Sequence, residues 1–315
     1  MPAIVHTSDE RTPATGPTTL PPGLVGKKIP GEVLITGWNA RADGSYTVTA
    51  RWPRSHRVYA PGDRTYSPML FTETVRQSLA LLTHAGCGVP LGHRMGWEYC
   101  HTRLVPAAMR VQRGSPGIEL TVRFSGADAR RGARSWRLTA EITVTRDGVP
   151  LGSASIHYTA HPPVIYDRLR GAYADAEEAT LRALAPPPPV TPTAVGKTDG
   201  SDVVLSPTPD PLRWQLRADV THHVFFDHAH DHIPGMVLLE AATQAARIQA
   251  GADRDAFAPV ALHTEFSRYT ELDAPCWIEA TPLERTPDGH TRSRITGTQN
   301  DRTTFTTELT ATTGH

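Results

Sequence analysis

Two apolar stretches of this sequence each carry a line of polar side chains that could do acid–base chemistry. These side chains are Glu240, Thr243, Gln244 and Arg247 in the second half of the chain, and Glu73, Arg76 and Gln77 in the first half. Residues three, four and seven positions apart share one face of a helix. A carboxylate on a helix face buried against a sheet tends to have a raised pKa, which suits a general acid or base. An ordinary amphipathic helix with one solvated face would show the same spacing.

The loop before the second polar line is rich in histidine. Its five imidazoles, which fall within eleven residues, belong to His222, His223, His228, His230 and His232. Histidine and aspartate are good metal ligands. The alternation of His228, His230 and His232 before a Pro-Gly pair nevertheless favours an acid–base loop over a metal site. We therefore expect no bound metal. For His222 and His223 we expect packing or capping roles.

Pro234 and Gly235 mark the start of the second helix. The amides of Gly235 and Met236 would then have no partner within the helix, and a helix start binds oxyanions and polarises carbonyls. A histidine beside these two donors, with a glutamate one turn further on, predicts an acyl-transfer site.

Simple patterns predict the elements that hold these residues. The two polar lines lie on helices over residues 69–84 and 236–250. Strands with period-two alternation are expected at residues 32–38, 45–52, 117–125, 135–148 and 151–160, and again at 212–220, 261–269, 276–284, 290–300 and 303–311. Each half is therefore one apolar helix with an antiparallel sheet, which places the chain in the α+β class.

The two halves also match each other without a gap. A shift of 167 residues lays residues 55–77 over residues 222–244, and the identical pairs are His56/His223, Met69/Met236, Glu73/Glu240 and Gln77/Gln244. Because the two polar helix residues coincide, an internal duplication is predicted.

Composition sets the remaining bounds. The 315 residues include 32 basic and 32 acidic side chains, so no net charge steers the chain toward nucleic acid or an anionic membrane. Three cysteines without a framework, no apolar run of membrane length and no secretory segment predict a cytoplasmic protein. We expect a disordered tail over residues 1–26, domains over 27–184 and 211–315, and a proline-rich spacer over 185–210.

The histidine loop resembles the signature of a known family. The motif D-H-x-x-D-H-x-P-G-M stands here as Asp227, His228, Asp231, His232, Pro234, Gly235 and Met236. With S-P-M-L-F-T-E-T-V-R-Q (67–77) and H-A-G-C-G-V-P-L-G-H (84–93), it is similar to the A-factor biosynthesis (AfsA) family, the γ-butyrolactone and butenolide synthases of actinomycetes. The resemblance covers residues 33–310. The loop also resembles that of hot-dog dehydratases of fatty-acid synthesis, with about three residues fewer.

This resemblance implies two hot-dog repeats fused as a pseudo-dimer, in a monomer or a homodimer, each with an antiparallel sheet around a central helix. It implies that a β-ketoacyl thioester, on carrier protein or coenzyme A, is joined to dihydroxyacetone phosphate without a cofactor. The residues implied as catalytic are Glu240, Glu73, His228, Asp231 and His232. Gly235 and Met236 would bind the thioester, and Gln244, Gln77, Arg76, Arg247 and Thr243 would bind substrate. Thr243 stands where the family leads us to expect arginine, which leaves Arg76 and Arg247 as candidates for the phosphate.

In hot-dog dimers the loop histidine faces the helix carboxylate of the other subunit. Carried over, His228 would face Glu73, and Glu240 would face the first loop near His56 and Asp63. Pro61 stands in the place of His228, so the two sites are not equivalent.

Two other functions use the same features. A hot-dog thioesterase or dehydratase would direct the same groups at water or at a β-hydroxyl. A non-catalytic double hot-dog would bind an acyl ligand, but it has no need of carboxylates on the helix faces.

Overall fold

The computed structural model describes residues 20–60, 65–112, 114–125, 135–251 and 256–313. Within these residues the backbone forms one continuous antiparallel sheet of twelve strands, in the order β1-β2-β4-β5-β6-β3-β9-β12-β11-β10-β8-β7. The strands of the first half are β1 (Ile35–Ala40), β2 (Tyr46–Arg51), β3 (Arg94–Leu104), β4 (Gly117–Ser125), β5 (Trp136–Arg146) and β6 (Val149–His161). Those of the second half are β7 (Leu205–Pro207), β8 (Arg213–Leu216), β9 (Phe257–Phe266), β10 (Cys276–Leu283), β11 (Thr291–Gln299) and β12 (Arg302–Thr313).

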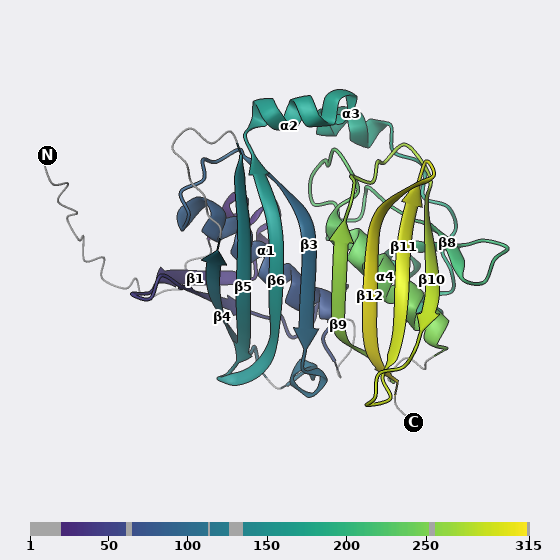
Figure 1. Cartoon of the computed structure of the whole chain (residues 1–315), viewed down its shortest axis with the longest axis horizontal. Helices are drawn as coiled ribbons and strands as arrows, with labels where there is room; N and C mark the ends of the chain where they lie inside the picture. Colours follow the sequence, from purple (N-terminus) through teal and green to yellow (C-terminus); the bar gives the residue numbers. More distant parts are fainter. Residues whose placement is uncertain (1–19, 61–64, 113, 126–134, 252–255, 314–315) are drawn as a thin grey trace, which may run out of the picture.

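The strand order shows that the chain is a duplication. The order β1-β2-β4-β5-β6-β3 is repeated by β7-β8-β10-β11-β12-β9, and the two six-stranded halves meet where β3 pairs with β9 (Figure 1). In that pair His101 lies opposite His263. The predicted α+β fold of two hot-dog repeats is confirmed.

One face of the sheet carries the two long helices, α1 (Pro68–Ala85) and α4 (Gly235–Ala250), which lie against the first and second half respectively (Figure 1). Both helices are buried nearly all round, because the sheet covers their apolar faces and the polar line packs inward as well. Ser67 caps α1 by accepting a hydrogen bond from the amide of Met69 at 3.2 Å. Gly251, with φ of 58°, ends α4 in the left-handed conformation.

Two shorter helices were not predicted. Helix α2 (Pro163–Arg170) and helix α3 (Ala176–Leu181) follow β6 and cross one end of the sheet between the two repeats (Figure 1). The expected strand at residues 212–220 is shorter than predicted, since β8 covers only Arg213–Leu216.

Two of the expected unstructured segments take part in the fold. The predicted tail already contains a 3-10 turn, η1 (Pro22–Val25), in which Val25 is fully buried; residues 1–19 lie outside the described part. The predicted spacer contains η5 (Pro192–Val195), η6 (Gly200–Asp202) and β7. The spacer prediction is therefore wrong for residues 192–207, because Pro192 starts the turn η5, which packs on α4, and β7 pairs with β8 in the sheet.

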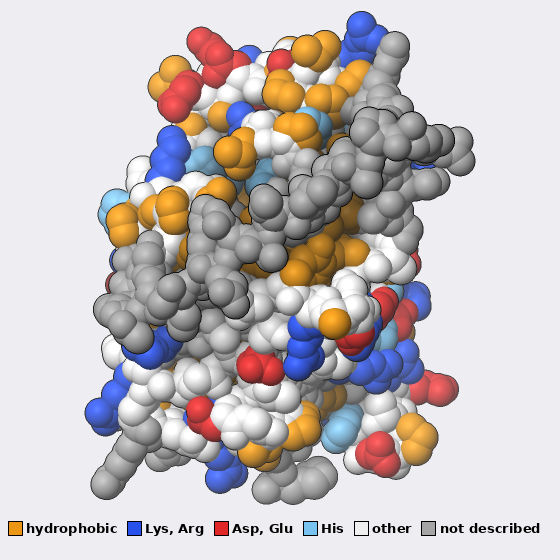
Figure 2. Space-filling view, turned by 90° about the vertical axis from the view of Figure 1, so that its left-hand side faces the viewer, with side chains coloured by type: hydrophobic (Ala, Val, Ile, Leu, Met, Phe, Trp, Pro, Cys, Tyr) orange, Lys and Arg blue, Asp and Glu red, His pale blue; other side chains and the backbone are white. Residues whose placement is uncertain are grey.

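The surface carries charges of both signs. On the end of the molecule seen in Figure 2, basic and acidic side chains both occur among apolar ones. Among the described residues, no helix has the length and apolarity to cross a bilayer.

Candidate functional site

The two helix glutamates are buried, and each is bound by cationic and amide groups. Glu73 is 1% exposed, and its carboxylate accepts from Arg76 Nε and Nη2, both at 2.8 Å, and from Gln77 Nε2 at 2.9 Å. Lys27 Nζ lies 3.3 Å away. Burial alone would raise the pKa of Glu73, but the charges of Arg76 and Lys27 outweigh it and lower the pKa to about 2. The expected raised pKa is therefore wrong for Glu73.

Glu240 lies in the matching position of the second repeat. It is 2% exposed, and its carboxylate pairs with Lys197 Nζ at 2.8 Å and accepts from Gln244 Nε2 at 2.7 Å. Gln244 Oε1 also accepts the amide of Val204 at 3.0 Å. In the first repeat Gln77 Oε1 accepts the amide of Leu34 at 2.8 Å. Each glutamate–glutamine pair thus joins its helix to the segment that precedes the first strand of the repeat.

The lysines in these pairs were missed by the sequence analysis. Lys27 and Lys197 each follow a glycine with positive φ, 66° at Gly26 and 74° at Gly196, which ends a short 3-10 turn and sends the lysine toward the helix. The repeated Val-Gly-Lys at residues 25–27 and 195–197 is the signal that could have shown them.

The histidine loop contains two aspartate–histidine pairs of the same geometry. His228 Nδ1 lies 2.6 Å from Asp227 Oδ1, and His232 Nδ1 lies 2.9 Å from Asp231 Oδ1. The two imidazoles are about one quarter exposed. Despite burial, hydrogen bonding from His228 and the charge of Lys27 lower the pKa of Asp227, and His232 does the same for Asp231. An ionised carboxylate on Nδ1 holds the proton there, so Nε2 of each histidine is left as a base.

The first repeat anchors the Asp227–His228 pair. The amide of Lys28 donates to Asp227 Oδ2 at 2.8 Å, and Lys27 Nζ donates to the carbonyl of Val224 at 3.3 Å. Despite burial, Glu73 raises the pKa of the Arg76 guanidinium, and the nearby Asp227 carboxylate adds to this effect. The loop of the second repeat is therefore held against the first repeat at Lys27 and Lys28, whereas the expected placement of His228 opposite Glu73 stays a prediction.

Helix α2 anchors the Asp231–His232 pair. Tyr166 Oη and Arg170 Nε each donate to Asp231 Oδ2 at 2.7 Å. Arg170 is 6% exposed and also binds Glu271 through both terminal nitrogens, at 2.8 and 2.6 Å. Sequence reasoning missed Tyr166 and Arg170, since nothing in their local pattern points to a partner 61 or 65 residues away.

The first two amides of α4, those of Gly235 and Met236, have no acceptor among the described residues. The amides of Val237 and Leu238 donate to Pro234, at 2.9 and 3.4 Å, whereas no described residue accepts from Gly235 or Met236. Pro234 precedes the helix without a side-chain cap. Two free donors three and four residues after His232 can bind an oxyanion.

His230 lies between the two pairs and belongs to neither. Its ring centroid is 4.2 Å from that of His228 and 5.7 Å from that of Phe226. Burial, and then the nearby His228 and His232, lower its pKa to about 3, so His230 is neutral.

His222 has the packing or capping role that was predicted for it. Its Nε2 lies 3.0 Å from Asp202 Oδ1, and its Nδ1 accepts the amides of Val224 and Phe225, both at 3.3 Å. His56 does the same in the first repeat, with Nε2 3.2 Å from Glu32 and Nδ1 accepting from two amides of its own loop. The structural partner of His56 is therefore His222 and not His223, because the second loop is one residue longer.

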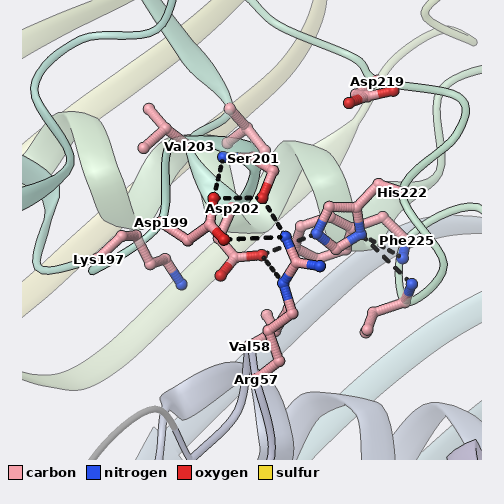
Figure 3. A network of polar contacts seen from close by, with 12 residues as sticks. Arg57, Val58, Lys197, Asp199, Ser201, Asp202, Val203, Asp219, His222 and Phe225 are labelled. Atoms are coloured by element: carbon pink, nitrogen blue, oxygen red, sulfur yellow. Dashed lines mark hydrogen bonds and ion pairs between the residues drawn. The ribbon is translucent and has the colours of Figure 1, made fainter.

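Arg57, from the loop of the first repeat, contacts the segment that precedes β7 in the second repeat. Its Nε donates to Asp202 Oδ1 at 3.0 Å, and its Nη2 contacts Ser201 and Asp199 (Figure 3). The backbone oxygen of Asp202 accepts from Gln244, which in turn holds Glu240. The first loop thus meets the Glu240 side through Arg57; Pro61 and Asp63 lie outside the described residues.

The remaining predicted substrate residues, Thr243 and Arg247, lie further along α4 from its start at Gly235. Thr243 donates its hydroxyl to the carbonyl of Leu239 at 2.9 Å, within its own helix. Arg247 packs over the ring of Phe257 at 4.8 Å, about 18 Å along α4 from Gly235. Of the two candidate arginines, only Arg76 lies near the histidine loop.

Comparisons with known proteins agree with this geometry. The family model described as A-factor biosynthesis hotdog domain matches residues 8–162 and 179–314. The chain belongs to the AfsA hotdog family. Residues 163–178, which include α2, lie outside the two matches.

Two curated relatives span nearly the whole chain. A protein of Streptomyces virginiae is 41% identical over 91% of this chain and 96% of its own length, and one of Streptomyces coelicolor is 34% identical over 92% and 90%. Both are named 2-oxo-3-(phosphooxy)propyl 3-oxoalkanoate synthase. A solved structure, that of a putative oleoyl thioesterase from Lactobacillus plantarum, is similar with a TM-score of 0.54. The match has 11% identity and covers 88% of this chain and 98% of that one, so the likeness concerns the fold alone.

Proposed function

We propose that this chain is an acyltransferase that joins a β-ketoacyl thioester to dihydroxyacetone phosphate, forming a 2-oxo-3-(phosphooxy)propyl 3-oxoalkanoate. The observation that carries the proposal is one loop that ends in a helix start: it holds the Asp227–His228 pair and leads to the amides of Gly235 and Met236, for which no described residue is an acceptor. A base and an oxyanion site are what acyl transfer to a hydroxyl needs. The names of the AfsA relatives supply the substrate class.

In the proposed reaction, His228 Nε2 removes the proton from the hydroxyl of dihydroxyacetone phosphate. The oxygen attacks the thioester carbonyl, and the resulting oxyanion accepts hydrogen bonds from the amides of Gly235 and Met236. The C–S bond then breaks, and the imidazolium returns its proton to the departing thiolate. The products are the ester phosphate and the free thiol of the carrier protein or coenzyme A.

Arg76 is the side chain we assign to the phosphate. Its charge reaches Asp227 and His230, and its guanidinium is about one quarter exposed. Arginine is well suited to phosphate because it presents several donors in a fixed plane. Glu73 orients Arg76 and acts as a positioning residue. We place Glu240 in the same class, since Lys197 and Gln244 occupy its carboxylate.

The Asp231–His232 pair is assigned to the thioester side. His232 precedes the helix start by three residues, and its ring lies 4.7 Å from that of Tyr269. Once the ester has formed, the acidic carbon between its two carbonyls can attack the ketone of the same molecule. Loss of water then gives a butenolide phosphate, and proximity within one molecule favours this closure.

The test is product analysis with and without the phosphate substrate. The purified protein is incubated with a panel of β-ketoacyl thioesters, and the products are analysed by mass spectrometry and thiol release. We expect the ester phosphate, and fast thiol release only when dihydroxyacetone phosphate is present. Equal thiol release with free β-keto acid as the product would instead identify a thioesterase.

A further inference from the structure

The residues that the acyl-transfer mechanism leaves unused include His230, which lies beside the base. A nitrogen of each imidazole of His228 and His230 and a carboxylate oxygen of Asp227 all lie within 4.8 Å of one another. Within the described part of the chain, this is the one group of three potential metal-ligating residues at such distances. We propose that Asp227, His228 and His230 form a binding site for a divalent transition metal ion such as zinc, and that the bound ion inhibits the enzyme.

The donor set fits this class of ion. Two imidazoles and one carboxylate are the ligands of many zinc and iron sites, and three protein ligands leave an open position for water. In a tetrahedral zinc site the ligand atoms lie about 3.3 Å apart, so groups within 4.8 Å of one another must approach by up to about 1.5 Å. His228 can make this movement, because its side chain is about one quarter exposed.

The carboxylate is already oriented for such a role. Asp227 Oδ2 accepts the amide of Lys28 at 2.8 Å, and Oδ1 accepts His228 Nδ1 at 2.6 Å. This hydrogen bond holds the carboxylate and the imidazole of His228 side by side, and an ion bound to both groups would replace it. Each carboxylate oxygen keeps a second lone pair for direct ligation.

Nearby positive charge does not prevent binding. Lys27 and Arg76 are the cations next to this cluster, and both pair with Glu73, at 3.3 and 2.8 Å. With Asp227, the two cations and two carboxylates of this region sum to zero.

Inhibition follows from the identity of the ligand atom. In the proposed reaction His228 Nε2 needs its lone pair to take the proton of the acceptor hydroxyl. A metal ion on Nε2 takes that lone pair, and a metal ion on Nδ1 leaves the ring proton on Nε2, so in either case His228 no longer acts as a base. This part of the inference rests on the proposed function, whereas the binding of the metal does not.

The test measures binding and inhibition separately. Cobalt(II) absorption and zinc(II) calorimetry are recorded on the full chain, and zinc inhibition is measured by thiol release with a chelator as the reversal control. We expect tetrahedral cobalt bands in the visible range, one zinc ion bound per chain and inhibition that the chelator reverses.

The variant His230→Gln separates the site from the catalytic base. We expect it to keep most of the basal thiol release while its zinc affinity falls at least tenfold. His223→Gln is the matched control, because His223 is exposed on the same loop and outside the cluster; it should bind zinc as the wild type does. If His230→Gln is unstable, His228→Gln should lose the cobalt bands in the same way.

Zinc binding that is unchanged in both His228→Gln and His230→Gln, or no binding by the wild type, would overturn the proposal. These results do not depend on turnover. A failure of the metal site is therefore distinct from a failure of the proposed acyl transfer, which product analysis without added metal decides.

Discussion

The two repeats share their architecture and differ in the chemistry at the start of the long helix. Both bury a glutamate bound to a lysine and a glutamine, and both hold a histidine against an acidic residue at the start of the loop. In the first repeat Pro68 has no amide hydrogen, and Ser67 occupies the amide of Met69. In the second repeat the amides of Gly235 and Met236 have no acceptor within the described part of the chain.

The loops that precede the two long helices also differ, and again the second repeat carries the groups that could react. The second loop carries two aspartate–histidine pairs, whereas residues 57–66 of the first contain no histidine. The shared residues are therefore those that hold each helix to its repeat, and the residues that could react with a thioester occur once. Duplication thus preserved two scaffolds, whereas the candidate catalytic groups of the loop and helix start lie in one of them.

The largest expected effect is at the base itself. We expect His228→Gln to lower kcat by about 10²–10⁴, because a positioned general base contributes a factor of this size. His223→Gln, on the exposed part of the same loop, should change kcat little. The measurement is the initial rate of thiol release with dihydroxyacetone phosphate at saturation. A rate within twofold of wild type would assign the base to another group, with His232 the first alternative.

A proline exchange tests the difference between the helix starts. Gly235→Pro gives α4 the proline that Pro68 provides at the start of α1, and it removes one oxyanion donor. Proline is well tolerated at the first position of a helix. We expect kcat to fall by about 10²–10³, as for loss of one oxyanion donor.

The reciprocal exchange, Pro68→Gly, should leave kcat unchanged, since α1 is capped by Ser67. Unfolding curves for both variants give the stability control. Equal losses of rate in the two variants would mean that both helix starts take part in the reaction, and the comparison between the repeats would then be wrong.

The Glu73 cluster should make stability depend on pH. The pKa of Glu73 is lowered to about 2 in the folded protein, so its contribution is present above the ordinary glutamate pKa and is lost as pH falls from about 4.5 to about 2. A shift of this size corresponds to about 3 kcal/mol of the free energy of unfolding.

The measurement is urea unfolding of wild type and Glu73→Gln between pH 7 and pH 2.5. The difference between the two proteins should shrink toward low pH. Glu119→Gln, on the exposed side of β4, is the control. A difference that stays constant over this range would show that the ion pairs of Glu73 do not carry the effect.

The smallest expected effect is at the contact from α2. Tyr166→Phe removes one hydrogen bond to Asp231, which is worth about 1.5–3 kcal/mol for a charged partner. We expect up to a tenfold rise in KM for the thioester with a smaller change in kcat, because His232 is assigned to the thioester side.

The matched control for this variant is Tyr173→Phe, whose hydroxyl contacts Asp273 at 3.3 Å. It should leave both constants close to wild type. If both phenylalanine variants raise KM equally, the effect belongs to the stability of the segment between the repeats and not to the orientation of Asp231.

Much of the fold was predictable from local patterns. The two helices, the alternating strands and the duplication follow from periodicities that one-dimensional spacing records directly. The short turns η1 and η5 were not predicted, since their few apolar residues become buried only against a helix that lies about fifty residues away in sequence. The Glu73 pKa was predicted in the wrong direction for the same reason, because burial is visible in the pattern and the partner Lys27 is not.

The sequence by itself determined the family, the two hot-dog repeats and the histidine loop before Pro234 and Gly235, since these depend on neighbouring residues and their spacing. Only the tertiary structure decided which groups meet: Asp227 with the amide of Lys28, and Asp231 with Tyr166 and Arg170. Hydrogen bonds and ion pairs depend on distances of about 3 Å between side chains from distant segments, and spacing along the chain does not contain those distances.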